Sequence, residues 1–162
     1  MDCATFLAIE TCPEAPYYPV ACAWSLPDGS IKSSLILPAD DWPAELCYSD
    51  HLDLNTIMSQ GHSVKDIILE MNDDLDGQWV ICNPDFTPGQ SFDHIAESID
   101  IHPAFEWSDS NHTMEETFSS YWREDLQELA FELELDFAQA EDQVRIMQLC
   151  WARANDLVAL DW

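Results

Sequence analysis

Closely spaced carboxylates are the side chains of this sequence with the clearest chemical potential. One group consists of Glu124, Asp125, Glu128 and Glu132. Side chains four residues apart lie on the same face of a helix, and like charges there destabilise it by roughly 0.2–0.5 kcal/mol per pair. Two interpretations stay open: a solvated acidic face, or a row of carboxylates that imitates a phosphate backbone and docks on a basic surface. A second acidic group comprises Asp73, Asp74 and Asp76.

The overall charge restricts the partners of this chain. Its 162 residues include 32 Asp and Glu but only 5 Lys and Arg, which gives a formal net charge of −27 at pH 7. Nucleic-acid binding depends on Lys and Arg that release counterions from phosphates. Repulsion between the acidic chain and the phosphates of a nucleic acid would be screened only beyond a Debye length of about 8 Å at physiological salt. We therefore expect no direct contact with nucleic acid, and a basic protein as the partner.

Length and composition favour one soluble domain over residues 1–162. Hydrophobic residues make up 47% of the chain, enough to fill a core. No apolar run is long enough to span a membrane, and the first residues do not resemble a signal peptide. The six cysteines form no Cys-x-x-Cys pair, and the histidines are not spaced to complete a zinc site. We expect a cytoplasmic, reduced protein without a membrane partner.

Hydrophobic periodicity predicts three antiparallel strands in the first part of the chain, over residues 4–10, 19–26 and 31–37. The turn Pro27-Asp28-Gly29 joins the second and third as a hairpin. Apolar residues at helical spacing then begin after Ser63, which forms a capping pair with Asp66, and Gly77 ends that helix.

The second part alternates strands and helices. We expect strands at 78–82 and 104–107, and helices at 91–99, from the capping pair Thr113 and Glu116 to Leu133, and across Ala140–Ala154. The order β-β-β-α-β-α-β-α-α predicts an α/β domain: a mixed sheet, with an antiparallel three-strand meander, flanked by helices.

Four sequence fragments resemble motifs of the DEDD 3′–5′ exonucleases, the family of proofreading exonuclease subunits and RNase T. Phe6–Thr11 resembles the first strand, which ends Asp-x-Glu-Thr in the family and Ala-Ile-Glu-Thr here. Gly61–Ile68 resembles the turn and helix before the second motif. Trp79–Pro84 is similar to the strand ending His-Asn, with Asn83 kept, and Phe137–Asp142 falls at the third motif, His-x-Ala-x-x-Asp. The resemblance spans nearly the whole chain and implies a ribonuclease H-like fold.

In that family, four carboxylates hold two divalent metals about 3.5–4 Å apart, which activate water for phosphodiester cleavage. The resemblance places the first aspartate at Ala8 and retains Glu10. A methyl group cannot replace an oxygen ligand. In the third motif Asp142 is retained, but the histidine that would act as general base falls on Phe137, which cannot take a proton from water.

The second motif allows two alignments. Direct alignment from Asn83 puts Thr87 at the aspartate position. An insertion in the loop instead puts Asp93 there, as part of a Phe-Asp pair. We favour the insertion because Ser91–Ile95 continues as a helix.

The sequence therefore favours a non-catalytic relative of the exonucleases. Such a protein would need no cofactor and would act as an acidic protein-binding module, either a nucleic-acid-mimicking inhibitor or an adaptor of a basic nucleic-acid-handling protein. The alternative is a divergent 3′–5′ exonuclease that uses Mg²⁺ or Mn²⁺. Glu10, Asp93 and Asp142 would then hold the metal, with Asp136 or Glu141 as a replacement ligand or base.

Overall fold

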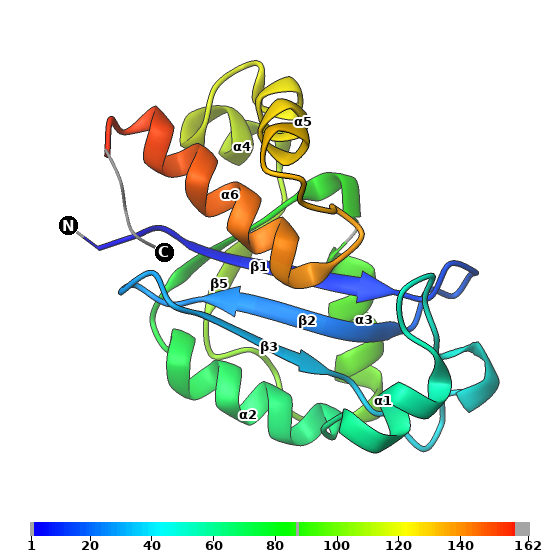
Figure 1. Cartoon of the computed structure of the whole chain (residues 1–162). Coiled ribbons are helices and arrows are strands. Elements are labelled where there is room, and N and C mark those ends of the chain that lie inside the picture. The colour runs from blue at the N-terminus through cyan, green and yellow to red at the C-terminus, as the bar shows by residue number, and fades with distance from the viewer. Residues whose placement is uncertain (1, 87, 158–162) are drawn as a thin grey trace.

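A five-stranded mixed sheet with the order β3-β2-β1-β4-β5 forms the centre of the protein (Figure 1). The computed structural model describes residues 2–86 and 88–157. The strands are β1 (Thr5–Thr11), β2 (Pro19–Ser25), β3 (Ile31–Leu35), β4 (Trp79–Cys82) and β5 (Glu106–Ser108).

The first three strands form the predicted antiparallel meander. Leu7 of β1 lies opposite Trp24 of β2, which in turn lies opposite Lys32 of β3. The β2–β3 turn closes with a hydrogen bond from the Leu26 amide to the Ser30 carbonyl oxygen. Gly29 within this turn has a φ of 89°, a conformation that glycine adopts without steric cost. The hairpin prediction is confirmed.

The other half of the sheet is parallel, because β4 pairs with β1 and β5 pairs with β4 in that direction. Parallel neighbours need a crossover, usually a helix. Here the connections run through α1 (Leu54–Gln60) and α2 (Val64–Leu75), and through α3 (Pro88–Ser98). Ser63 caps α2 as predicted: its Oγ accepts a hydrogen bond from the Asp66 amide at 3.1 Å.

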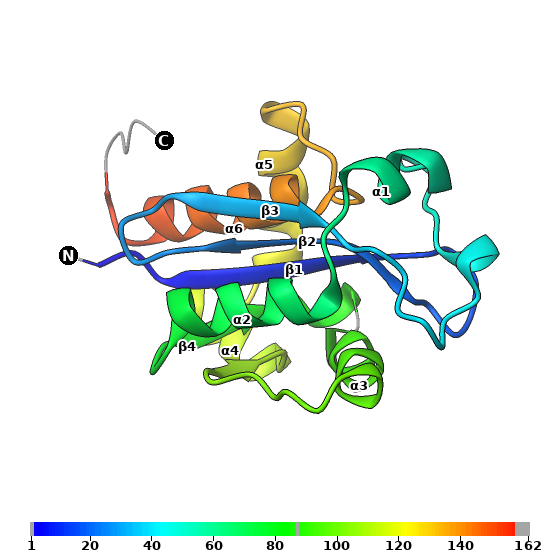
Figure 2. The ribbon, with the colours of Figure 1, turned by 90° about the horizontal axis from the view of Figure 1, so that it is seen from below.

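Helices cover both faces of the sheet (Figure 2). On one face α2 and α3 bury a core that contains Leu7, Ile9 and Ile68. On the other face α5 (Trp122–Glu132) and α6 (Ala140–Ala154) bury a second core with Phe6, Ala8 and Val144. Successive side chains of a strand point to opposite faces. The alternation along β1 therefore places positions 6, 8 and 10 on the side of α6.

The helices differ from the prediction in several details. The short helix α1 was not predicted, since only Ile57 of its seven residues is buried. The helix expected from Thr113 to Leu133 is two helices, α4 (Asn111–Thr117) and α5, because the chain turns at Phe118. The cap of α4 is Ser110 rather than Thr113: the Ser110 Oγ accepts from the Thr113 amide at 3.0 Å.

The remaining elements are two short 3-10 turns, η1 (Ala44–Leu46) and η2 (Pro84–Phe86). All six cysteines are free and buried, as expected of small hydrophobic side chains in a core. Across the described residues, none of the helices has the length and apolar composition needed to cross a membrane.

Candidate functional site

Glu10 is the buried carboxylate of the sheet. It lies near the end of β1, where the register of the β1–β2 pairing shifts directly after Glu10, and only 8% of its surface is exposed. Ser49 Oγ donates a hydrogen bond to Glu10 Oε1 at 2.7 Å. Burial raises the pKa of the Glu10 carboxyl above its ordinary value, while the Ser49 hydrogen bond and nearby His51 act in the opposite direction. The hydrogen bond from Ser49 and the nearby His51 therefore offset only part of the cost of burying the charged carboxylate.

The loop that carries Ser49 also contacts the segment before α6. His51 Nε2 lies 3.3 Å from Asp136 Oδ2. The Asp136 amide donates to Asp142 Oδ2 at 2.9 Å, so Asp142 serves as an acceptor for the chain that enters α6. It also lies in the first turn of that helix, where the helix dipole favours a negative charge. Asp142 thus has a structural role at the start of α6.

The positions where the resemblance expects a metal-bridging aspartate and a general base are both apolar. Ala8 is 4% exposed and belongs to the core beneath α6. Phe137 packs against the same core, and its ring stacks on Phe86 with centroids 6.2 Å apart. The Gln143 side chain fixes this segment by donating to the Phe137 carbonyl oxygen at 2.6 Å.

Asp93 lies away from these residues. It is exposed on α3, whereas its neighbour Phe92 is buried, and it lines neither of the two cavities that Glu10 lines. Because α3 begins at Pro88, almost directly after η2, Asp93 falls in the second turn of the helix rather than at its start. The competing position, Thr87, lies outside the described residues.

The donor set for a metal is dispersed. Within residues 2–86 and 88–157, no three His, Cys, Asp or Glu side chains are grouped closely enough to hold a metal ion. Glu10, Asp93 and Asp142, the set predicted for the exonuclease alternative, are therefore not gathered into one centre. The side chains of the described residues therefore do not fit a two-metal site.

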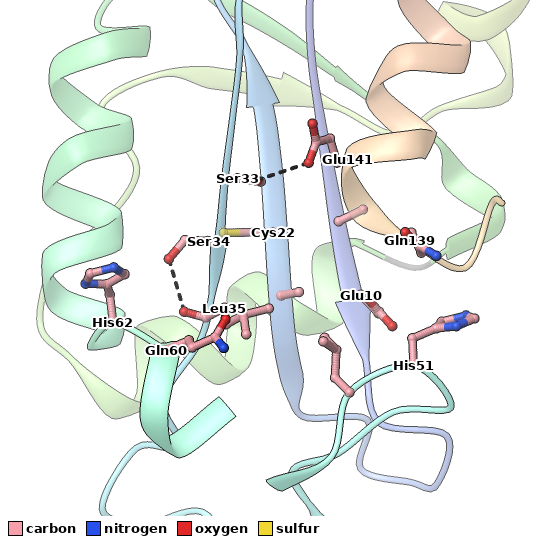
Figure 3. A pocket seen from close by; sticks show the side chains of 13 residues that line it. Glu10, Cys22, Ser33, Ser34, Leu35, His51, Gln60, His62, Gln139 and Glu141 are labelled. Carbon is pink, nitrogen blue, oxygen red and sulfur yellow. Dashed lines mark hydrogen bonds between the residues drawn. The ribbon is translucent and has the colours of Figure 1, made fainter. Parts of the chain in front are cut away.

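Two cavities of about 420 Å³ each meet at Glu10 and His51, which line both. The first lies over β2 and β3 and ends at Glu141, which accepts from Ser33 Oγ at 3.3 Å (Figure 3). The second extends from Thr11 and Tyr17 to Phe86 and Ala138. Together they form a groove, which we call the Glu10 groove.

Asp85 is a residue of this groove that the sequence reasoning missed. It accepts two hydrogen bonds of 2.9 Å from Arg123 of α5, in a bidentate pair. Arg123 also lies 4.2 Å above the ring of Trp122. In the sequence, Asp85 could have been noticed because it lies two residues after Asn83, which the family resemblance retains.

The carboxylates of the two predicted acidic groups differ in their exposure and in whether they already have a hydrogen-bond or ion-pair partner. On α5, Glu124 and Glu128 are exposed, while Asp125 accepts from Ser119 Oγ and Glu132 pairs with Arg153. On the other face of the sheet, Asp74 accepts from Trp24 Nε1 and pairs with Lys32. Asp73 and Asp76 remain exposed there.

The outward face of α5 also carries exposed aromatic rings. Tyr121 is 69% exposed and Phe131 is 88% exposed. Phe131 does not belong to the apolar face of α5, and its position in the sequence could therefore have indicated that its ring is exposed. Because α2 and α5 cover opposite faces of the sheet (Figure 2), the two acidic groups do not form one surface.

Comparison with known proteins finds solved structures with a similar fold, among them exonuclease I. No family model and no curated protein sequence matches the chain. Among solved structures, E. coli exonuclease I in complex with a dA16 oligonucleotide superposes with a TM-score of 0.67 at 11% identity, covering 96% of this chain and 42% of that one. Exonuclease I from Methylocaldum szegediense gives a TM-score of 0.62 at 14% identity, covering 94% and 40%.

A third neighbour is the structure of the yeast NOT1 MIF4G domain co-crystallised with CAF1, with a TM-score of 0.58, 13% identity, and coverage of 95% and 79%. This chain spans about two-fifths of the exonuclease I chains that it matches. At these identities the likeness concerns the fold alone: an α/β, exonuclease-type ribonuclease H-like architecture, as the sequence resemblance implied.

Proposed function

We propose that this chain is a non-catalytic relative of the DEDD exonucleases that binds a basic protein. Its partner would be a nucleic-acid-handling protein, whose basic surface this chain occupies as a nucleic-acid mimic. The outcome of binding would be inhibition or recruitment.

The observation that carries the proposal is the packing around β1. Where the related enzymes need a shared metal ligand and a base, this chain has the buried methyl group of Ala8 and the ring of Phe137 stacked on Phe86. Both side chains contribute to one core with α6. Neither a methyl group nor a phenyl ring offers an oxygen or nitrogen that could hold a cation or accept a proton.

The charge of the chain supports binding to a basic surface. A formal charge of −27 repels phosphates and attracts cationic surfaces, which speeds association with them at low salt. The outward face of α5 combines the exposed carboxylates Glu124 and Glu128 with the aromatic rings of Tyr121 and Phe131. Aromatic residues supply much of the binding energy at protein interfaces. We assign this face as the docking surface.

The alternative function, a 3′–5′ exonuclease with a divergent site, keeps one observation in its favour. Glu10 and Asp142 lie on the same side of the sheet, and Asp136 lies close enough to raise the pKa of Glu10. Such an enzyme would have to work without a ligand at position 8.

Affinity capture tests the proposed binding. We would immobilise the whole chain, pass a lysate of the source organism over it, and compare a Glu124→Gln/Glu128→Gln variant. We expect the wild type to retain a basic nucleic-acid-binding protein that the variant retains weakly, and that elutes between about 50 mM and 500 mM salt. The matched control is Asp73→Asn/Asp76→Asn, which removes two exposed charges from the other face. Equal retention by both variants and by the wild type, independent of salt, would contradict the proposal.

A further inference from the structure

The Glu10 groove is lined by several carboxylates, and His51 is the basic side chain that lies near Glu10. Its carboxylates are Glu10 and Glu141 in the first cavity, and Glu10, Asp50 and Asp85 in the second. Neither lysine nor arginine lines either cavity among the described residues. Asp85 is the one of these carboxylates that an arginine neutralises, from outside the groove. Carboxylates therefore outnumber the basic side chains that line the groove, which are His51 and His62.

Glu10 itself has acceptor positions left for a further partner. It is more than nine-tenths buried, and in the described part of the chain a single side-chain hydrogen bond, from Ser49, reaches its Oε1 atom. A carboxylate has about four acceptor positions on its two oxygens. A buried charge is tolerated when it is paired and its remaining acceptors are satisfied. Oε2 receives no hydrogen bond from the described residues and is not one of their fully buried unpaired atoms, so it is open to the cavities that Glu10 lines.

The chemistry of this arrangement selects a cation with several donors. A phosphate would meet like charge. A divalent metal would need more oxygen ligands than Glu10 supplies. A guanidinium group remains charged at all relevant pH values, presents five donors in a planar fork, and loses less solvation energy than an ammonium group when it is buried. It can bind a carboxylate through two parallel hydrogen bonds.

We propose that the Glu10 groove is a socket for an arginine side chain from the protein partner, with Glu10 as the buried acceptor. Glu141, at the far end of the first cavity, is placed to contact a second basic residue of the same segment (Figure 3). The occupant is an extended, arginine-containing stretch of protein that passes His51. This inference rests on the proposed function, and adds to the α5 surface a second, specific contact.

Binding of a defined peptide tests the socket. The probes are hexa-arginine and hexa-lysine peptides with blocked ends, titrated into the whole chain at about 150 mM salt and followed by calorimetry. We expect hexa-arginine to bind more tightly than hexa-lysine. Glu10→Gln keeps the size of the side chain but removes its charge, and should weaken hexa-arginine binding by roughly tenfold or more.

The matched control is Glu97→Gln, on the exposed surface of α3, which changes the formal charge by the same amount and should alter affinity by less than about twofold. Equal effects of the two substitutions would overturn the socket but leave the proposed function standing. Absence of binding by the wild type to both peptides would contradict the proposed function as well.

A second measurement does not depend on a variant. In ¹H–¹⁵N spectra of the wild type, hexa-arginine should shift the amide signals of residues around the groove, such as Ser49 and Asp50, more than those of α5. Shifts confined to α5 would place the peptide on the other surface and refute the socket.

Discussion

Restoring the missing aspartate is the most informative perturbation of the β1 core. In Ala8→Asp, a carboxyl group enters a position that is 4% exposed, in the core beneath α6 that also contains Val144. Burial raises the pKa of a carboxyl by up to roughly 3–5 units, so the new group would be protonated at pH 7. Because its ordinary pKa is about 3.9, taking up that proton at pH 7 costs about 4 kcal/mol of stability. A domain of this size has about 5–15 kcal/mol in total.

Ala8→Asn separates charge from volume, since Asn and Asp have nearly the same size. The asparagine variant should lose about 1–3 kcal/mol at every pH, because it adds a buried polar group to a packed core. The folded-state pKa of the aspartate is raised. The two variants should therefore be equally stable below about pH 4, and should diverge by about 1.4 kcal/mol per pH unit as the pH rises.

Urea unfolding between pH 4 and pH 8, with and without Mn²⁺, measures these differences. We expect Mn²⁺ to leave the midpoint of Ala8→Asp unchanged. If Ala8→Asp were as stable as Ala8→Asn at pH 7, and Mn²⁺ raised its midpoint, then position 8 would face a usable metal cleft and the reasoning from the core would be refuted.

Three further outcomes follow from the same structure. Glu10→Gln should raise the melting temperature at pH 7, because burial raises the pKa of Glu10 and the folded protein takes up its proton more readily than the unfolded chain. Below about pH 4.5 the variant should melt at the same temperature as the wild type, and an equal increase in melting temperature at both pH values would contradict this reasoning. All six cysteines should resist Ellman's reagent at pH 8 until the protein is unfolded, since they are buried and burial raises the pKa of Cys3 to about 11 and that of Cys22 to about 12; rapid reaction of the native protein would count against the packing. Phe131→Ser should change the free energy of unfolding by less than about 0.5 kcal/mol, because the ring is 88% exposed, yet weaken partner capture; unchanged capture would remove α5 from the interface.

The sequence predicted the sheet well because its signals are local. The turn at Gly29 and the apolar runs on either side specify a hairpin without reference to the rest of the chain. The cap at Ser63 and the apolar spacing of α2 are equally local. These local features were sufficient to predict the three-strand meander and the α/β fold class.

The errors in the helices arose where two local signals compete. Ser110 and Thr113 are both suitable caps, and Ser110 is the residue used, which moves the start of α4 towards the N-terminus. The turn at Phe118 has no glycine or proline to mark it. The helix α1 buries a single residue, so its periodicity is too weak to detect.

The candidate site depended on tertiary packing and was predicted only in part. The family resemblance pointed to Ala8 and Glu10 on β1 and to Phe137 before α6, and their functional importance stays a prediction. The contacts of Glu10 with Ser49 and of His51 with Asp136 join segments that are distant in sequence, and local patterns carry no record of them. The favoured second-motif residue, Asp93, is exposed on α3, away from the groove.

A nuclease assay with the purified chain tests the central claim most directly. The protein would be incubated with Mn²⁺ and end-labelled single-stranded DNA or RNA, beside an Asp142→Ala variant. We predict that neither protein shortens either substrate. Shortening from the 3′ end by the wild type, abolished by Asp142→Ala, would show that a catalytic centre survives, and would contradict the account of a binding module.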